Sequence, residues 1–333
     1  MLHSRIGLMM AGAPLRDLVA IAQAADSAGL HSLWVGDGGD PFGPLTAFAL
    51  ATARIRLGTG VAVWHRPPVV LASAAAQLAT TANGRFTLGL GAGPRQWNED
   101  WYGIAFTRPI ARMREYVTII RGVLDSASHG PFSFAGEHFQ VRSYRRSSEV
   151  PPVPIVLGTV GRQMNRLAGA VADGVLLDVL LSRRYLREVA LPAIAAGRQR
   201  RHQPASREET FTIGAMVCCI ADPDRRTAYQ AVKWGLLGHL AADYFFPVWQ
   251  DDGFGAETQL ARERAAAGDP AGAVAALPDA FVETIAIAGT PDDCRRQLRS
   301  WLELVDFVAL WAPRRPEAPH ASTLGYLIEQ FAS

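Results

Sequence analysis

The feature that most constrains the fold of this chain is a repeated alternation of short apolar runs with segments of helical periodicity. Apolar runs that predict strands occur at residues 5–10, 32–35, 55–63, 86–90, 154–157, 174–177, 210–220 and 305–311. Helix-period segments follow these runs at 14–28, 45–53, 68–81, 108–124, 162–170, 183–198, 290–302 and 322–331. Strands that alternate with helices along one chain predict a parallel sheet.

Two segments depart from the alternation. Residues 132–141 alternate like a small hairpin, and residues 222–288 are helical and rich in loops, with no obvious strand. Eight strand–helix units in 333 residues fit a barrel better than an open sheet. We therefore predict an α/β fold, a (β/α)8 TIM barrel, formed by a single domain over residues 1–333 with a helical insertion after the seventh strand.

Composition excludes several classes of protein. The chain is 49% hydrophobic and 19% charged, and its 33 basic and 31 acidic residues leave a net charge of +2, unlike a nucleic-acid-binding protein. No apolar stretch reaches the roughly 18 residues of a membrane span, and the N-terminal one is too short for a signal peptide. Three cysteines suit neither a disulfide framework nor a zinc site. We expect a soluble, cytoplasmic protein with no metal, nucleic-acid or membrane partner.

In such a barrel the chemistry lies on the loops that follow the strands. Those loops contain no nucleophile–base pair, zinc-binding helix or Walker sequence, but glycine follows almost every strand. Glycine lets the backbone approach a flat or phosphorylated ligand closely. The segment from Gly158 to Arg162 leads from a strand into a helix start, where N–H groups and the helix dipole favour an anion. An ordinary turn with a threonine cap is the alternative for this segment.

Taken in order, several segments resemble the luciferase-like monooxygenase superfamily, and within it the branch that uses the deazaflavin coenzyme F420. The matching segments are AADSAGLHSLWVGD, RIRLGTGVAV, NGRFTLGLGAG, NEDWYGIAF, RMREYVTIIRGVL, FAGEHFQV, PPVPIVLG, AGAVADGVLL and AGTPDDCRRQLRSWLELVDFVAL. The resemblance covers nearly the whole chain in the right order and leaves only 222–288 unmatched.

The resemblance implies a barrel that holds coenzyme F420 at the strand C-termini. Its cofactor-binding positions correspond here to Asp37, Gly38, Gly60, Val61, Ala62, Gly91, Ala92 and Gly93 near the ring or side chain, and to Gly158, Thr159, Val160, Gly161 and Arg162 at the phosphate. The Gly60–Val61 bond aligns with a peptide that is often cis in the family. The resemblance also implies a homodimer, for which the apolar faces of 45–50 and 68–78 are the candidates.

Two departures from the family pattern bear on the reaction. The sugar and alcohol dehydrogenases of this branch carry a histidine where this chain has Gly38, and a glutamate where it has Pro94. Without these acid–base partners, alcohol oxidation is disfavoured. We therefore expect a reductase that transfers hydride to an activated C=C, C=N or C=O of a small molecule that the sequence does not identify.

The candidate catalytic residues are His65 and Asp37. His65 follows the third strand and could donate a proton near neutral pH, although a partly solvated rim histidine is the alternative. Asp37 is either a site carboxylate or a helix N-cap. The candidate substrate contacts are Met10, Trp64 and Trp311; Trp64 could instead fill the mouth of the barrel.

Two other functions stay open at this point. One is an FMN-dependent monooxygenase that uses reduced flavin and oxygen; the other is a non-catalytic binding or scaffold protein, against which the glycine loops argue. The insertion carries an aromatic group that either roofs a substrate pocket or forms a dimer face; its members are His239, Tyr244, Phe245, Phe246 and Trp249.

Overall fold

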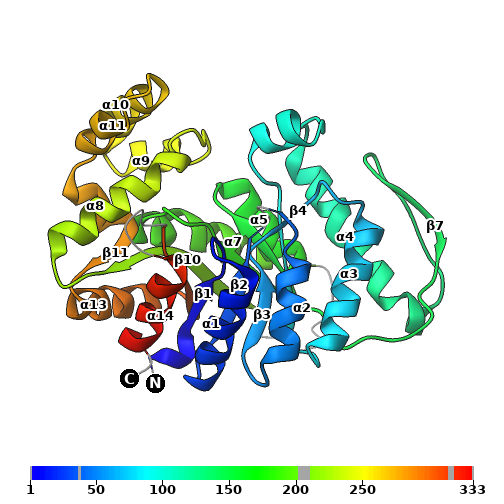
Figure 1. Ribbon diagram of the computed structural model, residues 1–333. Coiled ribbons are helices and arrows are strands. Elements are labelled where there is room, and N and C mark those ends of the chain that lie inside the picture. Colours follow the sequence, from blue (N-terminus) through cyan, green and yellow to red (C-terminus); the bar gives the residue numbers. More distant parts are fainter. Residues whose placement is uncertain (1, 37–38, 202–210, 314–318, 332–333) are drawn as a thin grey trace.

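The computed structural model describes residues 2–36, 39–201, 211–313 and 319–331. Its main sheet is a closed barrel of parallel strands, which confirms the predicted (β/α)8 fold (Figure 1). The barrel strands are β1 (Ile6–Met9), β2 (Ser32–Val35), β3 (Arg56–Thr59), β5 (Phe86–Gly91), β8 (Ile155–Thr159), β9 (Gly174–Leu177), β10 (Thr212–Ala221) and β12 (Phe307–Trp311). The barrel closes because β10 pairs with both β9 and β12.

The strands form where the sequence is continuously apolar, as expected for a sheet covered on both faces. Every residue of β1, β2 and β9 is buried. The helices that cover the barrel are α1 (Leu15–Ser27), α2 (Phe42–Ala51), α3 (Pro68–Thr81), α4 (Pro109–His129), α5 (Arg162–Val171), α6 (Arg183–Tyr185), α7 (Leu191–Arg198), α13 (Pro291–Leu302) and α14 (His320–Phe331). Across the described residues, no helix combines the length and the apolarity needed to cross a membrane.

The predicted third strand is interrupted in the structure. β3 ends at Thr59, and a second strand, β4 (Ala62–Val63), pairs with β5. The bond between Gly60 and Val61 lies in the interruption and is cis, as the family resemblance led us to expect. The predicted hairpin is also present, as β6 (Phe132–Ala135) and β7 (Gln140–Tyr144).

The insertion after β10 contains a strand that the sequence did not predict. Its helices are α8 (Arg225–Leu236), α9 (Phe246–Asp251), α10 (Gly255–Ala266), α11 (Pro270–Ala276) and α12 (Asp279–Ile285). They are followed by β11 (Ala286–Gly289), which pairs in parallel with β10 outside the barrel path. The prediction of a strand-free insertion is therefore wrong, because this strand has only four residues, most of them small, and directly follows a helix. In Figure 1, α9, α10 and α11 form a lobe above the barrel.

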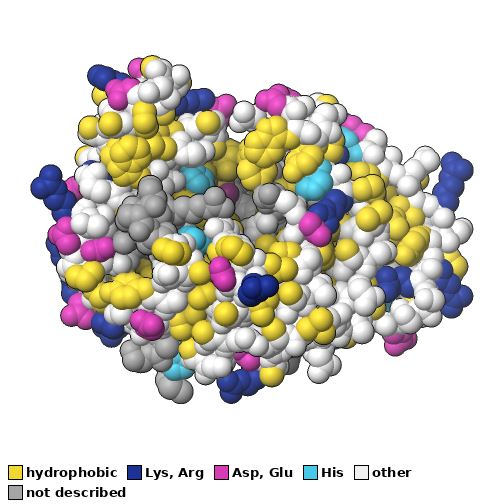
Figure 2. Space-filling view, viewed as in Figure 1, with side chains coloured by type: hydrophobic (Ala, Val, Ile, Leu, Met, Phe, Trp, Pro, Cys, Tyr) yellow, Lys and Arg dark blue, Asp and Glu magenta, His cyan; other side chains and the backbone are white. Residues whose placement is uncertain are grey.

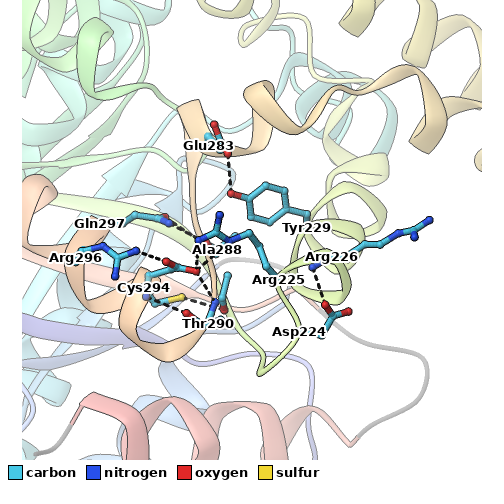
Figure 3. Close-up of polar contacts among 12 residues, drawn as sticks. Asp224, Arg225, Arg226, Tyr229, Glu283, Ala288, Thr290, Cys294, Arg296 and Gln297 are labelled. Carbon is cyan, nitrogen blue, oxygen red and sulfur yellow. Dashed lines mark hydrogen bonds and ion pairs between the residues drawn. The ribbon is translucent and has the colours of Figure 1, made fainter.

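The start of α13 ties the insertion to the barrel. Thr290 caps this helix in a capping box with Asp293, whose buried carboxylate also accepts hydrogen bonds from Arg225 on α8 and from Arg296 (Figure 3). Burial opposes the ionisation of Asp293, but these bonds lower its pKa to about 2. The carboxylate thus links α8 to α13 in its charged form.

Replacing Asp293 with asparagine should therefore destabilise the fold in a pH-dependent way. Near neutral pH we expect a loss of about 1.5 kcal/mol in the free energy of unfolding, the lower end for hydrogen bonds to charged groups. Because the folded pKa of about 2 lies below the usual 3.8, the contribution of the carboxylate is complete above about pH 4 and disappears towards pH 2. The free energies of unfolding of wild type and Asp293→Asn, measured with urea at a series of pH values, should converge as the pH falls through that range. Asp292→Asn, which changes an exposed neighbour, is the control. A stability difference between wild type and Asp293→Asn that does not change with pH would contradict the role of the charged carboxylate.

Candidate active site

The strand C-termini open on the face of the barrel that carries the insertion. In the orientation of Figure 1, β1 runs upward from the N-terminus, so these ends lie at the top of the molecule. Figure 2 shows a hollow in this face. The hollow lies between the lobe of α9–α11 and the segment around η2 (Trp97–Trp101), a π-helix that follows β5. We call this hollow the mouth.

The side chain of Val61 lies across the ends of β5 and β8. A Cβ atom built on Gly91 would come within 2.4 Å of Val61 Cγ2, and one built on Gly158 within 2.7 Å of Val61 Cγ1. The backbone at Gly93, with φ of 67°, lies in the left-handed region that favours glycine. Packing and conformation therefore account for these three glycines. Their contact with a cofactor ring stays a prediction.

Other predicted ligand contacts belong to the floor of the mouth. Met10 and Ala62 are buried, and Gly60 lies against the side chain of Met9. Trp64 is only 2% exposed, and its indole N–H donates to Asn98 Oδ1 at 2.6 Å. This arrangement favours the second interpretation of Trp64, in which it fills the mouth.

Asn98 is a residue that sequence reasoning missed. Its amide donates to the carbonyl oxygens of Ala92 and Pro94, both at 2.9 Å, while its oxygen accepts from Trp64. The guanidinium of Arg112 lies over the Trp64 ring, 4.8 Å from its centre. Asn98 thereby fixes the loop after β5, and no spacing pattern in the sequence indicates that role.

His65 lies at the end of β4, on the side of the mouth away from the insertion. Its ring stacks on Tyr102, with ring centroids 4.2 Å apart and an interplanar angle of 17°. Tyr102 directly follows the π-helix and is 37% exposed. The histidine is thus held at the rim by an aromatic partner.

The segment after β8 differs in part from the prediction of a phosphate site. The Thr159 side chain is buried and donates to Asn165 Oδ1 at 2.6 Å, so its hydroxyl faces the protein and not a ligand. Asn165 Nδ2 and the Tyr185 hydroxyl both donate to the carbonyl oxygen of Val160. These bonds fix the turn and give Thr159 and Val160 a structural role; contact of either residue with a cofactor phosphate stays a prediction.

The start of α5 keeps the features of an anion site. Gly161 is the N-cap, its φ of −73° suits any residue, and a Cβ atom there would meet nothing within 4 Å. Neither packing nor conformation requires glycine at this position. Arg162 is exposed, and it has no ion-pair partner among the described residues. The backbone N–H groups in the first turn of a helix lack intrahelical partners and favour an anion.

Asp178, which sequence reasoning did not select, follows β9 directly. Its backbone N–H donates to the Thr159 carbonyl at 3.0 Å, and its own Oδ1 accepts from Val179 N at 2.8 Å. Burial raises the pKa of Asp178 to about 6, against the smaller opposite effect of the Val179 bond. A carboxylate directly after an apolar strand of a barrel is the signal that could have found it.

The insertion covers the same strand ends with aromatic side chains. His239 packs edge-on against Trp311 of β12, with ring centroids 5.0 Å apart. Tyr244 lies near Asp178: burial raises the pKa of its phenol, and the negative charge of Asp178 raises it further. Phe245 and Trp249 are buried inside the insertion. Of the two interpretations of this aromatic group, the structure favours the roof over the mouth.

Asp37 and Gly38, predicted at the end of the second strand, lie outside the described residues. Within the described part of the chain, no cluster of three or more histidine, cysteine or acidic side chains could hold a metal ion.

Known proteins of similar sequence share most of their length with this chain. A 5,10-methylenetetrahydromethanopterin reductase of Methanolobus tindarius is 28% identical over 306 residues, which cover 87% of this chain and 88% of that protein. A Mycobacterium tuberculosis protein provisionally named as a coenzyme F420-dependent oxidoreductase is 29% identical over 315 residues, covering 86% and 88%.

Solved structures share the fold. The coenzyme F420-dependent tetrahydromethanopterin reductase of Methanopyrus kandleri has a TM-score of 0.81 at 22% identity, with 96% of this chain and 95% of that chain covered. The oxygenating constituent of 3,6-diketocamphane monooxygenase of Pseudomonas putida, in complex with FMN, has a TM-score of 0.66 at 18% identity, with 98% of each chain covered.

The family is shown by a match to residues 1–306 of a family model described as luciferase-like monooxygenase. The named relatives act as oxidoreductases or are named for coenzyme F420. With the barrel described above, these findings identify the chain as an oxidoreductase of the luciferase-like monooxygenase family.

Proposed function

We propose that this protein is an F420-dependent reductase that transfers hydride to an activated C=C, C=N or C=O of a small molecule. The observation that carries the proposal is the pairing of two features at one mouth. Val61 offers a branched aliphatic surface across β5 and β8, and α5 begins with an open glycine beside Arg162. A flat ring with a phosphate on its side chain requires both. The F420-dependent relatives favour the deazaflavin as that ligand.

The residues present fit such a cofactor. Gly161 leaves room for a phosphate against the first-turn N–H groups, and Arg162 adds a charge that no described carboxylate neutralises. Val61 would support the ring, with Asp37 near it. When bound, the reduced cofactor supplies the hydride.

The chain's own residues would orient the substrate and supply a proton. Trp64 and Asn98 seal the floor on one side, where exclusion of water strengthens polar interactions with a substrate. His65, at the rim, is our proposed proton donor, with Asp37 as a second site carboxylate. Pro94 cannot act as an acid or a base, and Gly38 has no side chain, so the direction of reduction is favoured over alcohol oxidation.

The test is an anaerobic titration of the full-length protein with F420 and, separately, with FMN, followed by their visible spectra. We expect F420 to bind with a shifted spectrum. The reduced form should then be oxidised by at least one acceptor from a panel of cyclohexenone (C=C), pyrroline (C=N) and cyclohexanone (C=O). Failure of F420 to bind would contradict the proposal.

The FMN-dependent monooxygenase is the second candidate, because a solved structure of the same fold holds FMN. It predicts stoichiometric oxygen consumption with reduced FMN and indifference to reduced F420. A scaffold protein predicts no spectral change with either cofactor. Glycines 91 and 158 do not argue against the scaffold, since Val61 requires them, whereas Gly161 does.

We also propose that the chain is one domain that assembles as a homodimer through α2 and α3. Leu50 on α2 and Val70 on α3 are 75% and 56% exposed, whereas Leu45, Leu71 and Leu78 are buried in the core. The contact face is thus narrower than the full apolar ranges that the sequence suggested. Light scattering at micromolar concentration should report about twice the chain mass. A stable interface of this kind should bury more than about 1,000 Å². Leu50→Asp should shift the mass to that of the monomer; a wild-type monomer would refute the proposal.

A further inference from the structure

We propose that Asp178 recognises a positively charged nitrogen of the substrate, an ammonium or iminium group, beneath a roof formed by Tyr244. This inference deepens the proposed function and rests on it, because it names the class of molecule that the mouth accepts. It limits the acceptor to compounds that carry a basic nitrogen at or near the reducible bond.

The backbone register directs Asp178 into the mouth. In the β8–β9 pair, Gly158 lies opposite Leu176, and paired residues of parallel strands face the same side of the sheet. Asp178 is two residues beyond Leu176, so it continues that face at the strand end. The same face meets Val61, since a Cβ atom on Gly158 would contact the Val61 side chain. The carboxylate therefore lies above the floor on which the ring is proposed to sit.

Among the described residues, no basic side chain pairs with Asp178, and the titratable group coupled to it is the Tyr244 phenol. The adjacent strand β10 pairs Ala215 with Leu177 and continues with apolar Met216 and Val217. Burial raises the pKa of Asp178 to about 6, so near neutral pH the group is largely a desolvated anion. Such an anion favours a ligand of opposite charge.

Aromatic faces complete a cation site. Tyr244, from the insertion, is close enough to Asp178 for the charge of that carboxylate to raise the pKa of its phenol, and at 38% exposure it remains accessible to a ligand. Trp311 and His239 stand two strands away, at the end of β12. Burial lowers the pKa of His239, so this imidazole is neutral and does not repel a cation. An aromatic face attracts a cation because the ring carries partial negative charge on its face.

The turn after β9 is held against the insertion. Leu180 is buried with φ of 68°, a left-handed conformation that a bulky residue adopts only where its surroundings impose it. Its carbonyl accepts a hydrogen bond from Trp249 Nε1 at 3.1 Å. Ser182, the N-cap of α6, and Arg184 within α6 both donate to Asp252, which directly follows α9. These bonds fix the carboxylate and its roof relative to each other.

The experiment compares two ring compounds of the same shape that differ in charge. Piperidinium carries a protonated nitrogen where tetrahydropyran has a neutral oxygen. Calorimetric titration of the full-length protein at about pH 8, with and without F420, should show piperidinium bound at least about tenfold more tightly than tetrahydropyran. Asp178→Asn should abolish this preference while it changes tetrahydropyran affinity less than about twofold. Lowering the pH to about 5 should weaken piperidinium binding to wild type and leave the variant unchanged.

Matched variants separate recognition from folding. Asp243→Asn removes a neighbouring exposed carboxylate that pairs with Arg262, and it should preserve the preference. Tyr244→Phe should keep most of the affinity for piperidinium, whereas Tyr244→Leu should lower it by about twofold to fivefold. Thermal unfolding should confirm that Asp178→Asn is folded, and Asp178→Glu should retain part of the preference.

Two results would overturn the inference: a wild type with no preference for piperidinium, including no binding at all, or an Asp178→Asn variant that keeps the preference. The parallel F420 titration keeps this outcome distinct from failure of the proposed function. Normal F420 binding without cation preference removes only the role of Asp178.

Discussion

Replacing Arg162 with glutamate should weaken the binding of F420 by at least about tenfold, or roughly 1.5 kcal/mol, the lower end for hydrogen bonds to charged groups. Arg162 opens α5 beside a glycine that leaves space for a ligand, and no described carboxylate neutralises it. The substitution removes a charge-assisted bond and adds repulsion of the phosphate. Fluorescence titration with the oxidised cofactor gives the dissociation constant directly.

Two further variants of α5 separate an effect on F420 affinity from an effect on the stability of the helix. A glutamate in the first turn of a helix interacts favourably with the helix dipole, so Arg162→Glu should not weaken α5 itself. Arg166→Glu makes the same change of charge one turn further along α5, away from the open helix start, and should alter affinity less than about threefold. Gly161→Ala should leave the fold intact and still reduce binding, because its methyl group would occupy the space proposed for the phosphate. If all three variants bind F420 with the affinity of wild type, the phosphate does not bind at this helix start.

The barrel could be predicted because its determinants are local and periodic. Strands buried on both faces produce continuous apolar runs, and the helices between them keep a period near 3.6 residues. β11 escaped prediction because Ala286–Gly289 is short, made mostly of small residues, and adjoins α12 without a break. Its strand conformation comes from pairing with β10, a partner distant in sequence.

The candidate site was harder to predict from the sequence, because a glycine can be required at a position for several physical reasons. Gly91 and Gly158 suggested the close approach of a ligand, but in the structure they accommodate the side chain of Val61. Thr159 resembled a phosphate donor, but its hydroxyl is bound to Asn165. Among the predicted site glycines that the structure describes, Gly161 alone lacks such an internal explanation. A residue type at a strand end therefore indicates an unusual environment without saying whether protein or ligand creates it.

Asp178 shows a second case: its position directly after an apolar strand was a signal in the sequence, but its surroundings were not visible there. Its desolvation comes from tertiary burial, and Tyr244, whose phenol pKa is raised by the charge of Asp178, is brought by the insertion from a remote part of the chain. The aromatic group of the insertion was visible in the sequence, but its position over β9 and β12 depends on contacts such as Trp249 with Leu180. Tertiary contacts of this kind have no local pattern.

Replacing His65 with glutamine should slow turnover by about 100-fold or more, the usual scale of general acid catalysis, and hardly change cofactor affinity. Glutamine can still form a hydrogen bond, but it does not titrate near neutral pH and so cannot transfer a proton. The measurement is the single-turnover oxidation of bound, reduced F420 by the fastest acceptor of the panel, as a function of pH.

Tyr102→Phe is the matched control, because it removes only a hydroxyl and retains the ring that stacks on His65 at 4.2 Å. This variant should react within about threefold of wild type, since the stack orients His65 through dispersion and not through the phenol. If His65→Gln reacts as fast as wild type at every pH, water or another side chain supplies the proton and only the role of His65 is lost. If it also loses F420 affinity, the histidine belongs to the binding surface of the cofactor. A rate that falls while affinity and stability hold would make His65 the proton donor, because a merely structural residue would not change the pH profile on its own.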